Sequence, residues 1–259
     1  MSAHPVHWID SHCHFDFTQF DSDRESVWQR AKAAGVGELM IPGVTIQQCE
    51  SLSAFCTHRP WHHALGLHPY FLDQHQTEHL QRLEALLAGG EALAVGEIGL
   101  DRVLAQDHEQ LEQQWFWFRQ QVDLARRFHK PLILHVRGMH DEAAAWLRLC
   151  HFSHGGVVHA FTGSAQQARA WHKLGFALGI GGAMTHSRAT RLRSTLATLP
   201  SEQLLLETDS PDMSPAFWAD KRNSPETLPM IAAMLASVQK VSIEQLKGTQ
   251  ASTFRRTFG

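Results

Sequence analysis

The sequence has 259 residues, of which 43% are hydrophobic and 19% are charged, and its formal net charge is −3 with neutral histidines. This balance is typical of a globular protein with a sizeable core and excludes a largely disordered chain. It contains no run of about 18 apolar residues, which excludes a membrane-spanning helix, and its charge excludes a strongly basic nucleic-acid-binding protein.

The amino-terminal residues and the cysteines indicate the cellular compartment in which the protein is found. Residues 1–10 lack the basic region and the apolar run of a signal peptide. Cys13, Cys49, Cys56 and Cys150 form no Cys-x-x-Cys pair, a pattern typical of reduced thiols. We therefore expect a cytoplasmic protein without a membrane partner, and we expect a monomer.

Eight short apolar runs, many of them ending in Gly, His or Asp, are predicted as β-strands. They cover residues 7–10, 36–41, 62–67, 92–98, 131–136, 156–160, 175–180 and 203–208. Continuous apolar runs are typical of parallel strands, because both faces of such strands are covered.

The stretches between these runs carry helix signals. Ser22-x-x-Glu25 and Ser164-x-x-Gln167 have the spacing of capping boxes, and Gly35 follows the first predicted helix as a stop. The clearest helix is predicted over residues 108–129, where apolar residues recur at spacings of three and four before Pro131.

Strand and helix alternate about every 32 residues, which predicts an α/β protein with a (β/α)₈ TIM barrel as a single domain over residues 1–259. An open doubly wound sheet is the alternative fold. The Gly-x-Gly-x-x-Gly turn of its dinucleotide-binding form is absent from the sequence. Because the active site of a barrel lies where its strands end, the residues that follow each strand decide the function.

Side chains that bind metals follow five of the predicted strands. His12 and His14 follow the first, and alternation along a strand places both on one side, about 6.6 Å apart along the chain. Glu97 lies in an apolar, Gly-flanked segment, where a buried charge requires a cation, and its two oxygens can bridge two ions. The remaining donors are His135, His159 and Asp209.

Each of these residues alone has an ordinary alternative as a satisfied polar side chain, but six donors at strand ends together predict a metal centre. Imidazole and carboxylate ligands suit Zn²⁺, Mn²⁺, Ni²⁺ or Mg²⁺ and leave positions open for water. Cys13 faces the opposite side and is expected to be a small buried residue. The fourteen histidines other than His12, His14, His68, His135 and His159 are expected to be surface polar residues.

Two further residues at strand ends are candidates for substrate contacts. The planar guanidinium of Arg137 suits a phosphate or carboxylate, although it could instead neutralise Glu97 or Asp209. His68 is a candidate metal ligand, substrate contact or turn residue, and we favour the substrate contact. Asp101 is either part of the site or an acid that caps the following loop.

These motifs, taken in chain order, resemble the TatD family of metal-dependent deoxyribonucleases, and within it the YjjV-like subgroup. The likeness covers nearly the whole chain. It rests on His12-x-His14, Gly66-Leu67-His68-Pro69, Gly96-Glu97-Ile98-Gly99-Leu100-Asp101, His135-Val136-Arg137, His159-Ala160-Phe161-Thr162-Gly163 and Glu207-Thr208-Asp209-Ser210-Pro211. The residues after Asp101, Arg102 to Ala105, depart from the family pattern, so the resemblance leaves the substrate preference open.

The resemblance implies an amidohydrolase-superfamily barrel that hydrolyses phosphodiesters of nucleic acid. The acidic charge balance favours an exonuclease on short or single-stranded DNA over a tight duplex binder. The resemblance also implies two divalent ions, one bound by His12, His14 and Asp209, one by His135 and His159, with Glu97 between them. Two such ions would lower the pKa of a bound water from its ordinary value toward about 7. Asp209 is then the candidate to accept the proton of that water, while Arg137 and His68 would hold phosphoryl oxygens.

Two other functions are compatible with the sequence. A small-molecule amidohydrolase, lactonase or phosphoesterase would use the same barrel. A non-catalytic metal-binding protein would instead bind partners through its Trp-rich helices, with Trp117 exposed. Five aromatic residues near the mouth are candidates either for base stacking or for core packing, namely Phe15, Phe17, Tyr70, Phe71 and Phe161.

Overall fold

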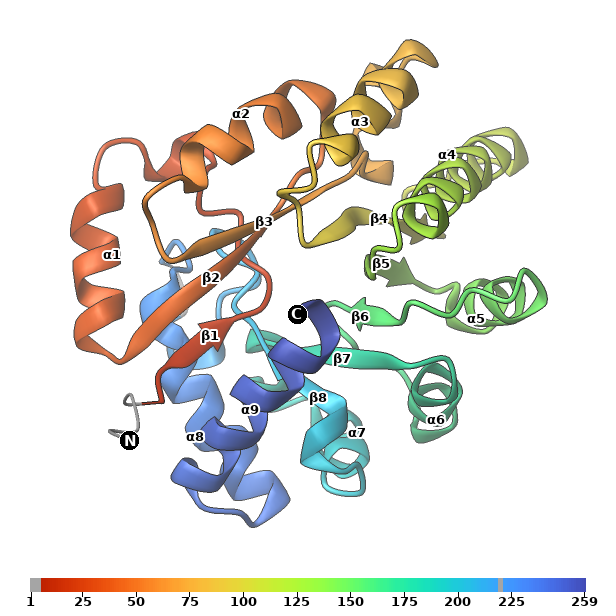
Figure 1. The fold of residues 1–259 in the computed structure, drawn as a ribbon. Coiled ribbons are helices and arrows are strands. Elements are labelled where there is room, and N and C mark those ends of the chain that lie inside the picture. Colours follow the sequence, from red (N-terminus) through yellow and green to blue (C-terminus); the bar gives the residue numbers. More distant parts are fainter. Residues whose placement is uncertain (1–5, 219–220) are drawn as a thin grey trace.

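The computed structural model describes residues 6–218 and 221–259. Eight parallel strands lie side by side in chain order, and the helices surround them (Figure 1). The strands are β1 (Trp8–Asp10), β2 (Val36–Pro42), β3 (Trp61–Leu65), β4 (Ala94–Asp101), β5 (Leu132–Arg137), β6 (Gly156–Val158), β7 (Phe176–Ile180) and β8 (Leu204–Leu206). Each predicted run overlaps one strand, so the single-domain (β/α)₈ TIM barrel is confirmed.

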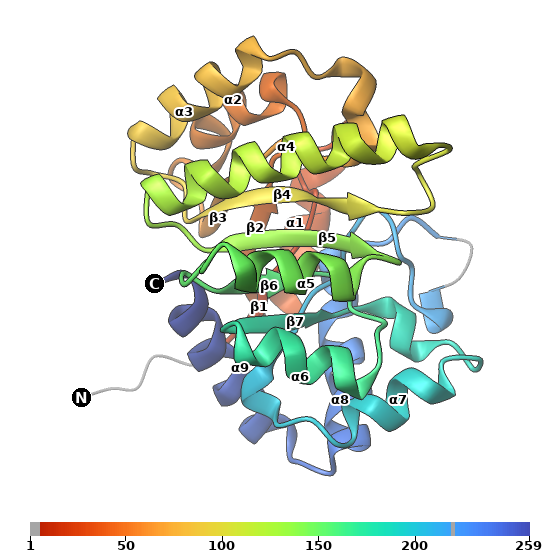
Figure 2. The same ribbon diagram turned by 90° about the vertical axis from the view of Figure 1, so that its right-hand side faces the viewer.

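The helices lie outside the strands, as the side view shows for α4, α5 and α6 (Figure 2). They are α1 (Arg24–Ala33), α2 (Ile46–Cys56), α3 (Glu78–Ala88), α4 (His108–Arg127), α5 (His140–Leu149), α6 (Ala165–Lys173), α7 (Thr190–Leu196), α8 (Leu228–Gln239) and α9 (Ile243–Phe258). A short 3-10 segment, η2 (Pro69–Gln74), follows β3. The helix predicted over residues 108–129 is α4.

One of the two predicted capping boxes forms. The Ser164 side chain accepts a hydrogen bond from the backbone of Gln167, which completes the predicted box at the start of α6. The box predicted at Ser22 is wrong, because α1 begins at Arg24. The Arg24 guanidinium donates to the carbonyl oxygens of residues 15–17 and so fixes this start of the helix.

The interior of the barrel contains an apolar layer with one residue from each strand. These residues are Ile9, Met40, Ala64, Ala94, Ile133, Val157, Ala177 and Leu205. Phe254 and Phe258 of α9 pack against this layer, and α9 lies across one end of the barrel (Figure 1). The helix closes the amino-terminal end of the barrel and leaves the site to the opposite end.

Hydrogen bonds between the ends of β1 and β8 close the barrel. The backbone N–H of Ser11 donates to the Leu206 carbonyl at 3.0 Å. Thr208 donates to the buried Asp10 carboxylate through its backbone N–H and its hydroxyl, at 2.9 and 2.6 Å. These bonds place the residues that follow β1 beside the residues that follow β8.

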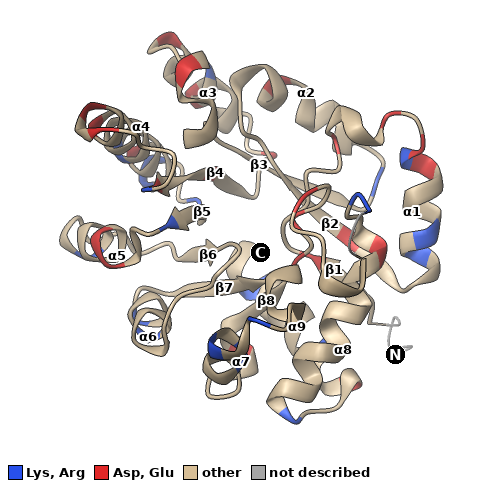
Figure 3. Cartoon of the chain, turned by 180° about the vertical axis from the view of Figure 1, so that it is seen from behind, with Lys and Arg blue, Asp and Glu red and all other residues tan. Residues whose placement is uncertain are grey.

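The surface carries charges of both signs. Residues of both signs, Lys or Arg and Asp or Glu, occur on the outer elements (Figure 3). None of the helices in the described part of the chain combines the length and apolar character that crossing a membrane requires.

Candidate metal centre

The structure brings the six predicted donors together at the carboxyl end of the barrel. Glu97 lies in β4 and His135 in β5, whereas the other four follow β1, β6 and β8. Five of the six line a cavity of about 360 Å³, and the sixth, His12, is fully buried. The residue types and the strand ends that suggested a site therefore meet in space.

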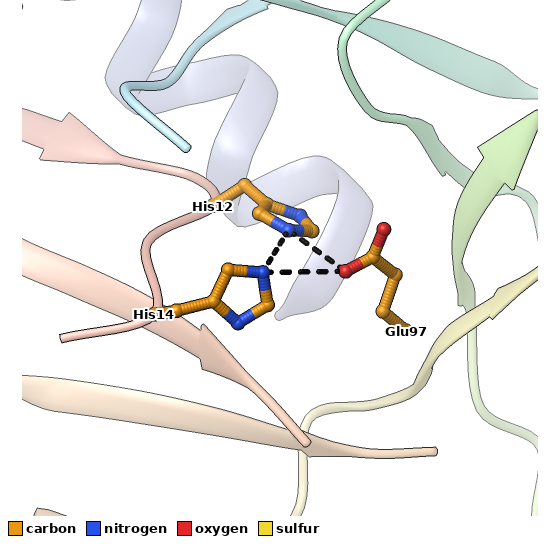
Figure 4. A group of neighbouring side chains, drawn as sticks. All are labelled: His12, His14 and Glu97. Atoms are coloured by element: carbon orange, nitrogen blue, oxygen red, sulfur yellow. Dashed lines mark hydrogen bonds and ion pairs between the residues drawn. The ribbon is translucent and has the colours of Figure 1, made fainter. Parts of the chain in front are cut away.

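One oxygen of Glu97 faces the donors that follow β1. Glu97 Oε2 lies 3.1 Å from His12 Nε2 and 3.4 Å from His14 Nε2 (Figure 4). These two nitrogens are 3.3 Å apart. Asp209 Oδ1 lies 3.5 and 3.6 Å from the same nitrogens. Two imidazoles and two carboxylates therefore surround one point.

The other oxygen of Glu97 faces a second set of donors. Glu97 Oε1 lies 2.7 Å from His159 Nε2, 3.2 Å from His68 Nε2 and 3.4 Å from His135 Nδ1. The His135 and His159 nitrogens are 3.1 Å apart. The carboxylate of Glu97 thus separates two groups of donors.

The residues fit a pair of divalent cations. Two pairs of imidazole nitrogens face each other at 3.3 and 3.1 Å, so lone pairs converge where a cation would be coordinated. Imidazole nitrogens and carboxylate oxygens are the ligands that zinc and the divalent transition metals use in proteins.

Burial and neighbouring charges set the protonation of these groups. Burial lowers the pKa of His12 to about 3 and that of His68 to about 4, so both imidazoles are neutral at pH 7. Burial by itself would raise the pKa of Glu97, but the surrounding imidazoles hold it well below its ordinary value. Glu97 is therefore ionised, which is the form in which a carboxylate binds a metal ion.

Asp101 has both of the roles that the sequence left open. Its Oδ2 lies 2.9 Å from His135 Nε2, and its Oδ1 accepts from the backbone N–H groups of Val103 and Leu104. With the His135 Nε2 proton directed at Asp101, the lone pair of Nδ1 faces Glu97 and the cavity. A carboxylate in this position would orient His135 toward a metal ion, so Asp101 is a candidate positioning residue.

His68 has a fixed tautomer. The backbone N–H of Tyr70 donates to His68 Nδ1 at 2.9 Å, so in the neutral ring the proton is on Nε2. Nε2 faces Glu97 and the cavity, where it can donate a hydrogen bond. This arrangement favours the predicted substrate contact over a role as metal ligand.

Arg137 is exposed at the end of β5 and lies outside the lining of the cavity. Two residues beyond His135 on the same strand, it is on the same side of the sheet. Within the described residues its guanidinium forms no salt bridge, so it does not neutralise Glu97 or Asp209 there. Its contact with substrate stays a prediction.

Sequence reasoning gave Glu207 no role in the site. Glu207 is fully buried, and its Oε1 accepts from the Ala160 N–H at 2.5 Å and lies 3.8 Å from His159 Nδ1. A side chain on Gly179 would collide with this carboxylate, so that glycine relieves crowding. An acid directly after the apolar run of β8 was the signal that could have identified it.

The aromatic residues near the mouth divide into two groups. Phe15 and Phe161 are buried in the core and are not available to stack on bases. Phe17, Tyr70 and Phe71 line the cavity that holds the metal donors.

Several residues that were expected at the surface are buried. Trp117 is 8% exposed and contacts His75 beyond η2, so the expectation of an exposed Trp117 is wrong. His63, His79 and His140 are also buried, and His140 accepts a hydrogen bond from the Trp171 indole.

Comparison with known proteins identifies the family to which this sequence is similar. Residues 9–259 match the family described as TatD related DNase. The "Uncharacterized metal-dependent hydrolase YjjV" of Escherichia coli (strain K12) is 39% identical over 242 residues, which cover 92% of this chain and 93% of that protein. The "3'-5' ssDNA/RNA exonuclease TatD" of Erwinia billingiae (strain Eb661) is 33% identical over 253 residues, with 93% and 95% covered.

A solved structure gives the same result. The crystal structure of YjjV, a TatD homologue from E. coli K12, matches with a TM-score of 0.92 and 37% identity, covering 98% of both chains. The predictions of the family and of a metal-dependent hydrolase are confirmed. The chain belongs to the TatD-related DNase family.

Proposed function

We propose that this chain is a two-metal exonuclease that shortens single-stranded nucleic acid from one end. The observation that carries the proposal is the division of donors between the two oxygens of Glu97. Because the donors come from strands throughout one chain, we propose that residues 1–259 act as one unit and as a monomer. The free cysteines suit a reducing cytoplasm.

The geometry favours His12, His14 and Asp209 as ligands of one cation and His135 and His159 as ligands of a second, with Glu97 shared. When bound, two divalent ions of the Zn, Mn, Ni or Mg type would make water acidic enough to yield hydroxide near pH 7 and would polarise a phosphoryl oxygen. The protein must then position the phosphodiester, accept a proton and exclude other reactions.

Asp209 is placed to accept that proton. Its carboxylate lines the cavity and faces His12 and His14. Its backbone has a positive φ of 56°, a left-handed conformation that Asp tolerates, and its N–H donates to the His12 carbonyl at 2.9 Å. The side chain is therefore fixed beside the point where the first group of donors converges.

His68 and Arg137 are placed to contact the phosphodiester. The Nε2–H of His68 can donate to a non-bridging oxygen as negative charge develops on it. Arg137 lies at the exposed end of β5. Its guanidinium can bind a phosphate of the nucleic acid that lies further from the cleaved bond.

Three features favour an unpaired strand end as the substrate. A relative at 33% identity carries the name of an exonuclease on single-stranded DNA and RNA. The cavity of about 360 Å³ has room for one nucleotide-sized group, and Phe17, Tyr70 and Phe71 line it with rings on which unpaired bases can stack. Because the surface carries charges of both signs, we expect contacts near the cavity, and not an overall positive charge, to bind the nucleic acid.

The test is an incubation of metal-reconstituted protein with end-labelled single-stranded DNA, a chromogenic phosphodiester and a cyclic amide, each with a chelated control. We expect stepwise shortening of the DNA that chelation abolishes. Turnover of the chromogenic ester or the amide alone would identify a small-molecule hydrolase instead. Inactivity toward every substrate at full metal loading would identify a metal-binding protein without this activity.

A further inference from the structure

A second cavity, of about 470 Å³, lies beside the metal centre. It shares the lining residues Tyr70 and Phe71 with the cavity that the candidate metal ligands line, so the two spaces meet at these rings. We call the second cavity the glutamine groove. Its lining consists of Pro69–Gln74, Leu104, Gln106, Gln110, Gln113 and Gln114.

The start of α4 explains why amides gather here. The Asp107 side chain caps α4 by accepting from the Gln110 N–H at 2.9 Å. Helical spacings of three and four then place Gln110, Gln113 and Gln114 on one face. Gln114 is buried and exchanges two hydrogen bonds with the backbone of Asp101, which attaches this face to the end of β4.

The other amides of the groove have hydrogen-bonding groups that no described protein group occupies. Gln110 accepts from the Gln106 N–H at 3.0 Å, which leaves its NH₂ group free to donate. In the parts of the chain that the structure describes, the side chains of Gln74, Gln106 and Gln113 form no hydrogen bond with protein groups. These amides therefore have donors and acceptors for a ligand.

The charge of the groove excludes one class of ligand group and favours another. Its lining contains no Lys or Arg, and Asp73 is its one charged residue. Phosphates are bound by cationic side chains or by backbone N–H groups, so this lining does not suit them. Amides pair with the polar edges of unpaired bases, and the Tyr70 ring, in a residue 66% exposed, offers a stacking face.

We propose that the glutamine groove binds an unpaired nucleobase of the substrate, close to the phosphodiester that is cleaved. The base stacks on Tyr70, and Gln113 with Gln110 hydrogen-bonds its edge. Because an amide both donates and accepts, the site requires a base but tolerates any of them. This inference rests on the proposed function. Leu104, in the loop that departs from the family pattern, is part of the same wall.

The test uses single-stranded DNA oligonucleotides with one abasic position, moved through the first four nucleotides at the degraded end. For each enzyme we would measure the ratio of kcat/KM on the intact oligonucleotide to kcat/KM on each abasic one. Any loss of folded protein cancels in this ratio. The enzymes are the wild type, Tyr70→Ala and Gln113→Ala, with Phe116→Ala and Gln120→Ala as matched controls, exposed residues of α4 outside the groove.

With wild type we expect one abasic position to lower kcat/KM by roughly 5- to 100-fold, as the loss of one stacked base does. Tyr70→Ala should abolish most of this penalty at that position, Gln113→Ala should reduce it by roughly 2- to 10-fold, and both controls should keep it. The same penalty in all five enzymes, or none at any position in the wild type, would overturn the groove assignment. If the wild type shortens no oligonucleotide at all, the proposed function itself fails.

Discussion

Each end of the barrel has a carboxylate surrounded by histidines, and the two groups differ in a way that separates an ion-pair cluster from a metal centre. At the closed end, Glu38 of β2 accepts from His7 Nε2 at 2.5 Å and from His62 Nε2 at 2.8 Å, one on each oxygen. Arg255 of α9 lies 3.6 Å away. At the mouth, Glu97 is 2% exposed, and five imidazoles surround its two oxygens.

The difference lies in burial and in the number of donors. The Glu38 side chain is 17% exposed, and each of its oxygens has one imidazole partner, so protons and water complete the hydrogen-bond pattern. Around Glu97, imidazole nitrogens face one another and protons cannot satisfy every contact. The same residue types therefore form an ion-pair cluster at one end and a group of donors that could bind a cation at the other.

Removing the metal should produce the largest effect. Chelation should reduce hydrolysis to background, because the described side chains alone do not generate hydroxide at pH 7. It should also lower the melting temperature, since an ion at 100 times its Kd adds about 2.7 kcal/mol to the free energy of unfolding. Calorimetry with and without chelator measures this shift. A Glu38→Gln variant should show the same shift, and an unchanged melting temperature of wild type would contradict the metal centre.

Replacing Glu97 with Gln should weaken the binding of both cations, because Glu97 is the ligand that the two sites share. The amide retains the shape of the carboxylate but loses the charge that lies between them, so we expect bound metal to fall below two ions per chain and kcat to fall on the order of 10³-fold. Elemental analysis and the phosphodiesterase assay measure these changes. Glu38→Gln is the control and should keep both values. Full metal content with full activity in Glu97→Gln would refute the shared ligand.

Replacing Asp101 with Asn tests the support of one ligand. The carboxamide keeps the loop cap but weakens the hydrogen bond that orients His135, so we expect one of the two ions to bind about 10- to 100-fold more weakly. Metal titration by calorimetry distinguishes this effect from a general loss of structure, because the affinity of the other ion should not change. Equal weakening of both ions would contradict a positioning role through His135.

The sequence was sufficient to predict the barrel and the donors because both depend on local pattern. Parallel strands appear as apolar runs, and their carboxyl ends share one end of the barrel, so His12, Glu97 and Asp209 were expected to meet. The start of α1 was missed, since it depends on Arg24 reaching carbonyl oxygens several residues earlier.

What the sequence left open depends on particular contacts in the folded chain that no local residue pattern specifies. The hydrogen bond from His135 to Asp101 joins two strands, and the tautomer of His68 depends on the backbone of Tyr70 two residues away. Trp117 is covered by the segment that follows β3, which no helical pattern in α4 could reveal. The glutamine groove likewise requires η2 and α4 to lie side by side.

The smallest expected effect concerns stability at the closed end. The imidazoles of His62 and His7 outweigh partial burial and lower the pKa of Glu38 to about 2 from its ordinary 4.5, which corresponds to at most roughly 3 kcal/mol. Because the folded pKa is depressed, this stability is present above pH 4.5 and is lost as the pH falls toward 2. Partial exposure makes about 1 kcal/mol the expected size.

Denaturant unfolding of wild type and Glu38→Gln at pH 6, 4 and 3 measures this contribution. The difference in unfolding free energy between the two proteins should be largest at pH 6 and should shrink steadily at the two lower values. A difference that is independent of pH would show that the variant acts through packing, and Glu38 would then not be an ion-pair partner of these histidines. Activity should change little, because the apolar layer of the barrel separates Glu38 from the mouth.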